Sequence, residues 1–447
     1  MLELRGRSFS LCDGISRRSF LKVGALGLGG LTLPRLLQVR AAASAPRDTA
    51  VILFWMAGGP SHIDTYDMKP SAPDVVAGPF RPQRTNQVGM TFCELMPRQS
   101  RLADKITIIR SLAHSLGVHD DASHWVQTGY PLLAARERGQ QNPAQGAVVS
   151  HLLGPRQSGM PAYVCIPEAY NSRQGFYQAA AFLGARHNPV NAGGDPSLGN
   201  YRLPEFTLPA DLSAARLQNR RHLAERLDSL SQHVEHTGQL AAMSDAQQRA
   251  FDLITGPQAR RAFDLTREPL TLREKYGRHA WGHAALLARR LVEAGVTFVT
   301  INLYEKDIDW WDDHYNIETN LRWRLPRYDQ ALSALIEDVY DRGLDRRVLI
   351  AAFGEFGRGP RIDQNAGRGH WPRAMSALLS GGGIRTGQVI GATTPDGADP
   401  SDRRLGPGDL LASIYHVLGI DADRMLPDRQ NRPIRLVEHG LPIAELF

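Results

Sequence analysis

The chain has 447 residues, with 52 Lys or Arg against 46 Asp or Glu, which gives a formal net charge of +6. Residues 1–45 contain seven of the basic residues and two of the acidic ones, so the rest of the chain is close to neutral, with 45 basic and 44 acidic residues. A nearly neutral chain of about 400 residues predicts a large folded core, and its charge gives no basis for binding nucleic acid or an anionic membrane surface.

The first 45 residues have the pattern of an export signal. Ser16–Lys22 contains a twin arginine, Val23–Leu33 is an uncharged run rich in Gly, Ala and Leu, and Ala41–Ala45 offers small-residue cleavage sites. The apolar run is shorter than the roughly 20 residues of a membrane span, so we expect a cleaved signal and no stable membrane anchor. Twin-arginine (Tat) export carries folded proteins. We therefore predict residues 46–447 to be a periplasmic or cell-surface bacterial protein, delivered by the Tat machinery.

The cysteines exclude one kind of metal site. Cys12 lies in the predicted signal, so only Cys93 and Cys165 remain in the exported chain. Two cysteines allow one disulfide without requiring it, and they are too few for a site built on thiolates.

Strand and helix patterns alternate after the signal. Six apolar runs have the length of buried strands: Ala50–Met56, Ile106–Ile109, Ala162–Ile166, Val296–Leu303, Arg347–Phe353 and Ser376–Leu379. Helical patterns occur at His279–Ala294, Leu321–Tyr340 and Pro407–Leu418. This alternation predicts an α/β domain whose mainly parallel sheet is covered by helices on both faces. Residues 171–277 instead combine a Gly-, Pro- and Asn-rich stretch with Arg- and Gln-rich helices, and we predict a helical insertion or lid there.

Polar clusters follow four of the predicted strands. They are Gly58–Asp67, Ser111–Tyr130, Asp307–Asn316, and Gly354–Arg358 with the later Arg368–Trp371. Ligands of open parallel sheets bind beyond the carboxyl ends of the strands, so we expect these clusters to meet. Histidine nitrogens and carboxylate oxygens are ligands of hard and borderline divalent metals. The pattern therefore predicts a metal site, with candidate ligands Asp312, His314, Glu355 and His370.

Each cluster also has an interpretation without a metal. His114, His119 and His124 are five residues apart, which places them about 140° apart per step on a helix, so they cannot share one face. At least one of them should be solvated or hydrogen-bonded within the fold. In the same interpretation Asp64 and Asp67 are turn caps, Trp310–Trp311 are packing residues, Glu355 and Arg358 form a mutual ion pair, and His370 is a loop histidine.

Several motifs resemble those of a known family. They are the Tat leader, Phe54–Asp64 (FWMAGGPSHID), Trp311–His314 (WDDH), Gly354–Arg358 (GEFGR) and Gly367–Pro372 (GRGHWP). Together they resemble the exported bacterial family catalogued as domain of unknown function 1501, which is placed in the alkaline phosphatase and sulfatase superfamily. The resemblance covers essentially the whole exported chain. It implies an alkaline phosphatase-like α/β fold, a three-layer sandwich, which agrees with the alternation of strands and helices.

The superfamily resemblance also implies a chemistry, which is the hydrolysis of a phosphate or sulfate ester at one or two metal ions. The nucleophile of that chemistry, a hydroxyl or a modified cysteine, begins a helix after the second strand. The segment His119–Pro131 is similar to the nucleophile helix of sulfatases, and on that alignment His119 takes the place of the nucleophile. An imidazole can be a metal ligand, a base or a phosphoryl acceptor.

The chain departs from the superfamily pattern at its metal ligands. Gly58–Gly59 stands where the first strand usually ends in Asp, and Glu355–Phe356 stands where an Asp-His pair is usual. Close relatives have Asp at the position of Gly369, so a carboxylate that could orient His370 is missing. The resemblance thus implies at most one divalent metal (Zn, Ca or Mg), held by Asp312, His314 and His370.

Two hypotheses follow for the exported chain. In the first it hydrolyses an anionic phosphate or sulfate ester, on a small molecule or a glycan. The roles then assigned are Glu355 and Asp64 as further metal ligands, Arg358 and Arg368 with Gly58 and Gly59 as the anion site, and His119 and Arg358 as catalytic residues. In the second hypothesis the protein binds anionic ligands or glycans without turnover, since a fold does not determine an activity.

Overall fold

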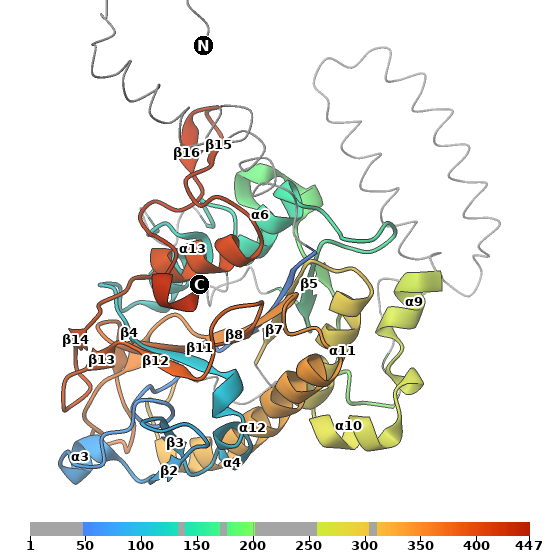
Figure 1. The fold of residues 1–447 in the computed structure, drawn as a ribbon. Helices are drawn as coiled ribbons and strands as arrows, with labels where there is room; N and C mark the ends of the chain where they lie inside the picture. Colours follow the sequence, from blue (N-terminus) through green and yellow to red (C-terminus); the bar gives the residue numbers. More distant parts are fainter. Residues whose placement is uncertain (1–47, 133–138, 170–176, 200, 202–256, 304–310) are drawn as a thin grey trace, which may run out of the picture. The chain divides into compact units, whose positions relative to one another are not determined.

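An eight-stranded sheet forms the centre of the unit Asp48–Phe447 (Figure 1). The computed structural model describes residues 48–132, 139–169, 177–199, 201, 257–303 and 311–447. The predicted signal, residues 1–45, and most of the predicted insertion at 171–277 lie outside the described residues. The order of the sheet is β12-β4-β11-β8-β1-β7-β5-β6.

All six predicted strands are present in the central sheet. They are β1 (Ala50–Trp55), β4 (Thr107–Leu112), β5 (Tyr163–Ile166), β7 (Phe298–Asn302), β8 (Val348–Phe353) and β11 (Met375–Gly381), which are joined at the edges by β6 (Val190–Asn191) and β12 (Gln388–Ile390). Four two-stranded ribbons lie outside the sheet: β2 (Pro82–Arg84) with β3 (Thr91–Cys93), β9 (Gly357–Arg358) with β10 (His370–Trp371), β13 (Ala392–Thr393) with β14 (Pro400–Asp402), and β15 (Met425–Pro427) with β16 (Pro433–Arg435).

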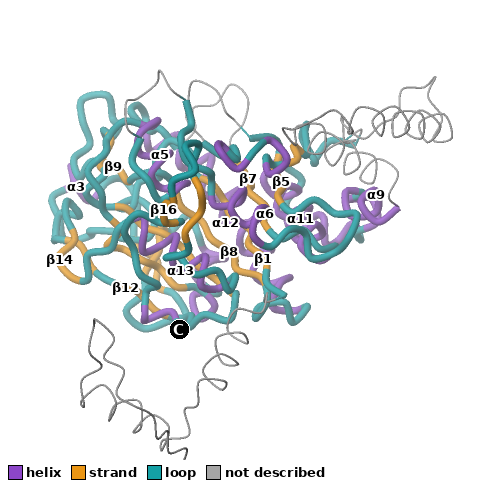
Figure 2. The backbone as a smooth tube through the Cα atoms, turned by 90° about the horizontal axis from the view of Figure 1, so that it is seen from above, coloured by secondary structure: helices purple, strands orange, loops and turns teal. Residues whose placement is uncertain are grey.

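Helices cover both faces of the sheet. The described helices are α3 (Asp74–Ala77), α4 (Pro97–Ser100), α5 (His119–Thr128), α6 (Gln145–Leu152), α9 (Pro257–Phe263), α10 (Leu270–Tyr276), α11 (Ala280–Glu293), α12 (Ile317–Asp341) and α13 (Pro407–Val417). Figure 1 shows α10, α11 and α12 on one side of the sheet and α6 and α13 on the other. Figure 2 gives the view from above, in which α5 is also labelled. The predicted α/β class with a mainly parallel sheet is confirmed.

Strand β1 shows why a continuous apolar run marks the middle of such a sandwich. Its side chains alternate between the two faces, so Ile52 and Phe54 pack in the core under α11 and α12, whereas Val51 and Leu53 pack in the core under α13. Every residue of β1 is buried, because helices cover both faces.

One strand of the sheet runs against the others. β1 pairs in parallel with β7 and β8, and β5 pairs in parallel with β7, but β11 is antiparallel to both β4 and β8. A loop that precedes β11 therefore lies at the same edge of the sheet as the loops that follow its neighbours.

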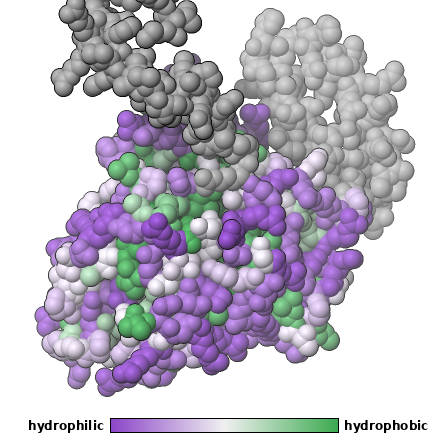
Figure 3. Space-filling view, in the orientation of Figure 1, coloured by the Kyte–Doolittle hydropathy of each residue, from purple (hydrophilic) through white to green (hydrophobic). Residues whose placement is uncertain are grey.

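The face seen in Figure 3 is mostly hydrophilic, with apolar residues in small separate patches. Among the described residues, no helix combines the length and the apolar composition needed to cross a bilayer. Cys93 and Cys165 are both buried free thiols, so the disulfide that the sequence allowed is not formed.

Candidate metal centre

The strand directions bring four distant segments to one edge of the sheet. The loops after β1, β7 and β8 leave at this edge, and helix α5 begins there with His119 after β4. Because β11 is reversed, the ribbon strand β10 that precedes it also reaches this edge, and it carries His370. Side chains that are far apart in the sequence therefore meet.

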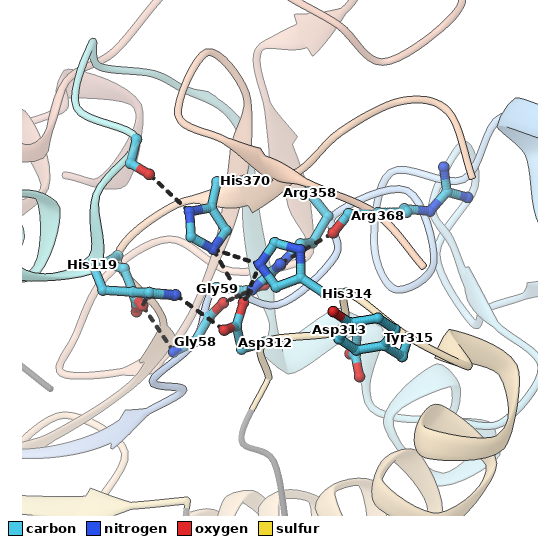
Figure 4. A network of polar contacts seen from close by, with 12 residues as sticks. Gly58, Gly59, His119, Asp312, Asp313, His314, Tyr315, Arg358, Arg368 and His370 are labelled. Atoms are coloured by element: carbon cyan, nitrogen blue, oxygen red, sulfur yellow. Dashed lines mark hydrogen bonds and ion pairs between the residues drawn. The ribbon is translucent and has the colours of Figure 1, made fainter. Parts of the chain in front are cut away.

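Asp312 lies among three imidazoles, and we call this set of Asp312, His119, His314 and His370 the Asp312 cluster (Figure 4). Its Oδ2 is 3.2 Å from Nε2 of His119. Its Oδ1 is 3.2 Å from Nε2 of His370 and 3.1 Å from Nε2 of His314. The side chains of Asp312, His119 and His370 are 31%, 28% and 24% exposed, and that of His314 is 37% exposed, so the cluster is open to solvent.

Hydrogen bonds on the far side of two imidazoles fix which nitrogen carries the proton. Nδ1 of His119 lies 2.6 Å from Oε1 of Glu355, and Nδ1 of His370 lies 2.8 Å from the carbonyl oxygen of Gly117. Both acceptors require Nδ1–H, so in the neutral rings Nε2 carries the lone pair. Each Nε2 lone pair then faces an oxygen of Asp312. Such a contact is repulsive unless a proton or a metal cation lies between the two atoms.

The geometry fits a metal ion. His119, Asp312 and His370 each offer one ligand atom, and these three atoms lie within 4.8 Å of one another. Two ligands of a tetrahedral zinc ion, each about 2.05 Å from it, are about 3.3 Å apart, which is close to the nitrogen–oxygen distances given above. Calcium and magnesium prefer oxygen ligands. A set rich in imidazole therefore suits zinc, or another borderline ion, better than the calcium or magnesium that the sequence left open.

When no metal cation is bound, a proton lies between an imidazole nitrogen and the carboxylate of Asp312. Burial lowers the pKa of His119, but hydrogen bonds to Asp312 and Glu355 outweigh this effect and raise the pKa to about 9. Burial would raise the pKa of Asp312, yet hydrogen bonds from His119 and His370 and the charge of Arg358 hold it well below its usual range. A metal ion at this place would therefore compete with the proton on His119.

Glu355 orients His119 instead of reaching the cluster itself. Its buried side chain accepts, at Oε1, the bond from His119 and a 2.8 Å bond from the backbone N–H of Gly58. A carboxylate behind a histidine ligand fixes the ring and makes its free nitrogen more basic. The sequence predicted Glu355 as a metal ligand, and the structure places its Oε1 against His119 and the backbone of Gly58. The predicted ion pair with Arg358 is not formed.

Arg358 is hydrogen-bonded to the loop after β1 and to the segments that carry Asp312 and Arg368. Its guanidinium is therefore not available to a substrate anion. Its buried guanidinium donates to the carbonyl oxygens of Gly58, Gly59 and Arg368, and also to Oδ1 of Asp312. Gly58 and Gly59 have φ angles of +105° and +82°, and a Cβ on Gly58 would lie 2.5 Å from the backbone nitrogen of Asp312. These glycines therefore permit close approach of the loops, and they do not form the predicted anion site.

Asp64 and Arg368 neutralise each other away from the cluster. Nε of Arg368 lies 2.7 Å from Oδ2 of Asp64, and both side chains are fully buried. Asp64 also accepts from the hydroxyl of Ser61, and Arg368 donates to the backbone oxygen of Val76. The charged groups of Asp64, a predicted metal ligand, and Arg368, a predicted anion-binding residue, are thus directed at each other.

Two further histidines of this region have structural roles. His124 donates from Nδ1 to the carbonyl of Tyr130 and accepts at Nε2 from two backbone N–H groups. Burial lowers its pKa to about 4. His114 donates to the backbone oxygen of Glu355, and burial likewise lowers its pKa to about 4. Both are neutral and hydrogen-bonded within the fold, as the interpretation without a metal expects.

The sequence did not predict the hydrogen bonds of Asp313, the residue after Asp312. Asp313 accepts two 2.7 Å bonds from Arg324 and a 2.9 Å bond from Asn320, which tie the Asp312 loop to helix α12. The only signal was an arginine on the apolar face of a helical pattern, where a buried partner is required. Trp311 is fully buried against Trp281, in agreement with the packing interpretation.

Three solved structures illustrate the similarity of this fold to known proteins at low sequence identity. The PsFucS1 sulfatase from Pseudoalteromonas sp. is 11% identical, covers 91% of this chain and 72% of its own, and has a TM-score of 0.38. The lipoteichoic acid synthase LtaP from Listeria monocytogenes is 10% identical, with 85% and 74% covered and a TM-score of 0.34. The periplasmic domain of EcEptC from Escherichia coli, solved with Zn, is 10% identical, with 84% of each chain covered and a TM-score of 0.35.

No curated protein sequence matches the chain. The family model described as "Protein of unknown function (DUF1501)" matches residues 48–447, which is the whole unit that contains the sheet and the Asp312 cluster. The chain therefore belongs to the DUF1501 family.

Proposed function

We propose that the protein is an exported, metal-dependent hydrolase of a phosphate or sulfate ester. His119, Asp312 and His370 hold the metal, and zinc is the ion that suits them best. One observation carries this proposal: two imidazoles whose protons are fixed on their far nitrogens both direct Nε2 at the same carboxylate. A metal ion would take the place of the protons that otherwise lie between these nitrogens and the carboxylate.

The bound ion would polarise the ester and lower the pKa of water beside it. The reaction forms a bond from the water oxygen to phosphorus or sulfur and breaks the bond to the ester oxygen, which takes up a proton. His119 is not the nucleophile in this scheme, because Glu355 holds one of its ring nitrogens and Asp312 faces the other.

We assign to His314 the transfer of the proton that the departing ester oxygen takes up. It is the most exposed member of the cluster, and within the described residues no partner fixes its Nδ1. Its ring can therefore exchange a proton with solvent or substrate without breaking an internal bond. This proposal exchanges the roles that the sequence predicted for His119 and His314.

Metal content and turnover test these assignments separately. The exported protein should contain close to one metal ion per chain by mass spectrometry, and it should hydrolyse p-nitrophenyl phosphate or p-nitrophenyl sulfate. His119→Ala and His370→Ala should lose the metal. His314→Gln should keep the metal and lose at least tenfold in kcat. His439→Ala, an exposed histidine elsewhere, is the control. Unchanged metal content in His370→Ala would refute the site.

A second candidate is a binding protein without turnover. Among the described residues, no hydroxyl group is hydrogen-bonded to the Asp312 cluster, and the predicted anion-binding arginines are both paired within the fold. Full metal occupancy, with binding of inorganic phosphate or sulfate but no hydrolysis of either ester, would support this function instead.

We also propose Tat export to the periplasm or cell surface. The twin-arginine pattern of residues 1–45 supports it. Replacing Arg17 and Arg18 by Lys should leave the protein in the cytoplasm, measured by fractionation against a cytoplasmic marker.

A further inference from the structure

A cavity of about 640 Å³ lies at the carboxyl ends of β5 and β7. Glu168, which follows β5, and Asn302, the last residue of β7, line one side. Trp281 of α11 and Trp323 of α12 line another. The volume is typical of sites that take a small ligand, and the position is where open parallel sheets bind ligands.

Three charged side chains line this cavity. The carboxylates of Glu168 and Asp195 and the guanidinium of Arg327 line it, and within the described residues none of the three forms an ion pair. Asp195 accepts one 2.7 Å bond from the backbone of Ser197, and Arg327 donates to the carbonyl of Trp323. Acceptors and donors thus face the same space, and the lining that the structure describes has one more acid than base.

Two indole rings form a corner of this cavity. The rings of Trp281 and Trp323 are 5.9 Å apart and nearly perpendicular, at 81°. The guanidinium of Arg327 lies 4.1 Å from the centre of the Trp323 ring, which fixes both side chains. Trp281 is in turn stacked on Trp311, the residue before Asp312. The aromatic corner is therefore rigid and continuous with the segment that carries the metal centre.

We propose that this cavity binds an uncharged sugar ring. Sugar hydroxyls both donate and accept, so they satisfy the carboxylates of Glu168 and Asp195 together with the guanidinium of Arg327. The apolar face of a pyranose packs on an indole. The net negative charge of Glu168, Asp195 and Arg327 disfavours a phosphate, sulfate or uronate group in this cavity. If the proposed ester hydrolysis holds, an anionic ester on a glycan would place its charged group at the Asp312 cluster and a neutral ring here.

Binding of defined sugars tests the proposal without any assay of turnover. Glucose, galactose, mannose, N-acetylglucosamine and chitobiose are titrated into the exported protein by isothermal calorimetry. At least one should bind with a Kd on the order of 0.1–1 mM. Trp323→Ala and Asp195→Asn should each weaken that binding at least tenfold, and Trp323→Phe should restore most of it. The Asn at position 195 can keep the acceptor for Ser197.

Two controls separate this cavity from the metal centre and from general instability. Arg322→Gln changes an exposed residue on the same helix that pairs with Glu318, so it should bind the sugar normally. His370→Ala should lose the metal but keep sugar binding. The proposal is overturned if none of the five sugars binds below about 10 mM. It is also overturned if choline or free tryptophan binds in preference to all of them, or if the two cavity variants bind like the parent protein.

Discussion

Replacing Glu355 by Gln tests whether the carboxylate behind His119 controls metal affinity. The glutamine has the same shape and can still accept the bond from His119 Nδ1, which is 2.6 Å long in the parent protein. It removes the negative charge that makes Nε2 more basic. Changes to such supporting groups weaken metal binding about 10- to 100-fold, which corresponds to about 1.4–2.7 kcal/mol.

The assay is a zinc titration of the metal-free protein in competition with a fluorescent chelator of known affinity. Glu318→Gln is the matched control, because this exposed carboxylate pairs only with Arg322 on its own helix among the described residues. His119→Ala gives the full loss for comparison. The supporting role of Glu355 is refuted if Glu355→Gln retains the parent affinity within twofold while His119→Ala loses it.

Three further predictions concern the supporting structure. Arg368→Ala should lower the free energy of unfolding by about 3–5 kcal/mol in denaturant titrations, because it leaves the buried Asp64 charge unpaired. Adding Asp64→Asn to this variant should recover part of the loss. A double variant that recovers no stability would contradict the pairing. Gly58→Ala should abolish metal binding because its Cβ would displace the Asp312 backbone, whereas Gly89→Ala, with φ +80° and open space around it, should retain the metal. His124 has a folded pKa of about 4 against an ordinary 6.5, so between these pH values the unfolded chain binds the extra proton. Stability should therefore fall as the pH drops below about 6.5, by up to about 1.4 kcal/mol per pH unit from this residue, and His124→Gln should flatten that slope; an unchanged slope would count against the assignment.

The fold was largely predictable, because the central strands are buried on both faces and appear as continuous apolar runs. β1 is the clearest case, since all six of its residues are buried. The direction of β11 was not predictable, because an apolar pattern does not indicate which way a strand runs. The edge strands β6 and β12 were also missed, being only two and three residues long.

The sequence indicated which segments of the site would lie together, but not which side chains would pair with each other. The ends of the strands indicated that Asp312, His314 and His370 would lie together. Which charges pair across loops depends on distances that no local pattern contains. Asp64 and Arg368 are 304 positions apart in the sequence, and nothing near either residue indicated the other. The sequence placed His119 in the polar cluster after β4, but only the family resemblance gave it a role, and its contact with Glu355 was not predicted.

The reversed strand also limits when the metal centre can be completed during synthesis. Among the described strands of the sheet, β4, which positions His119, pairs only with β11 and β12, and both come from the last quarter of the chain. Until residues 375–390 have left the ribosome, β4 has no neighbour among the described strands and His119 has no fixed position relative to His370. A nascent chain that stops before β11 would expose three unpaired strand edges, two on β4 and one on β8.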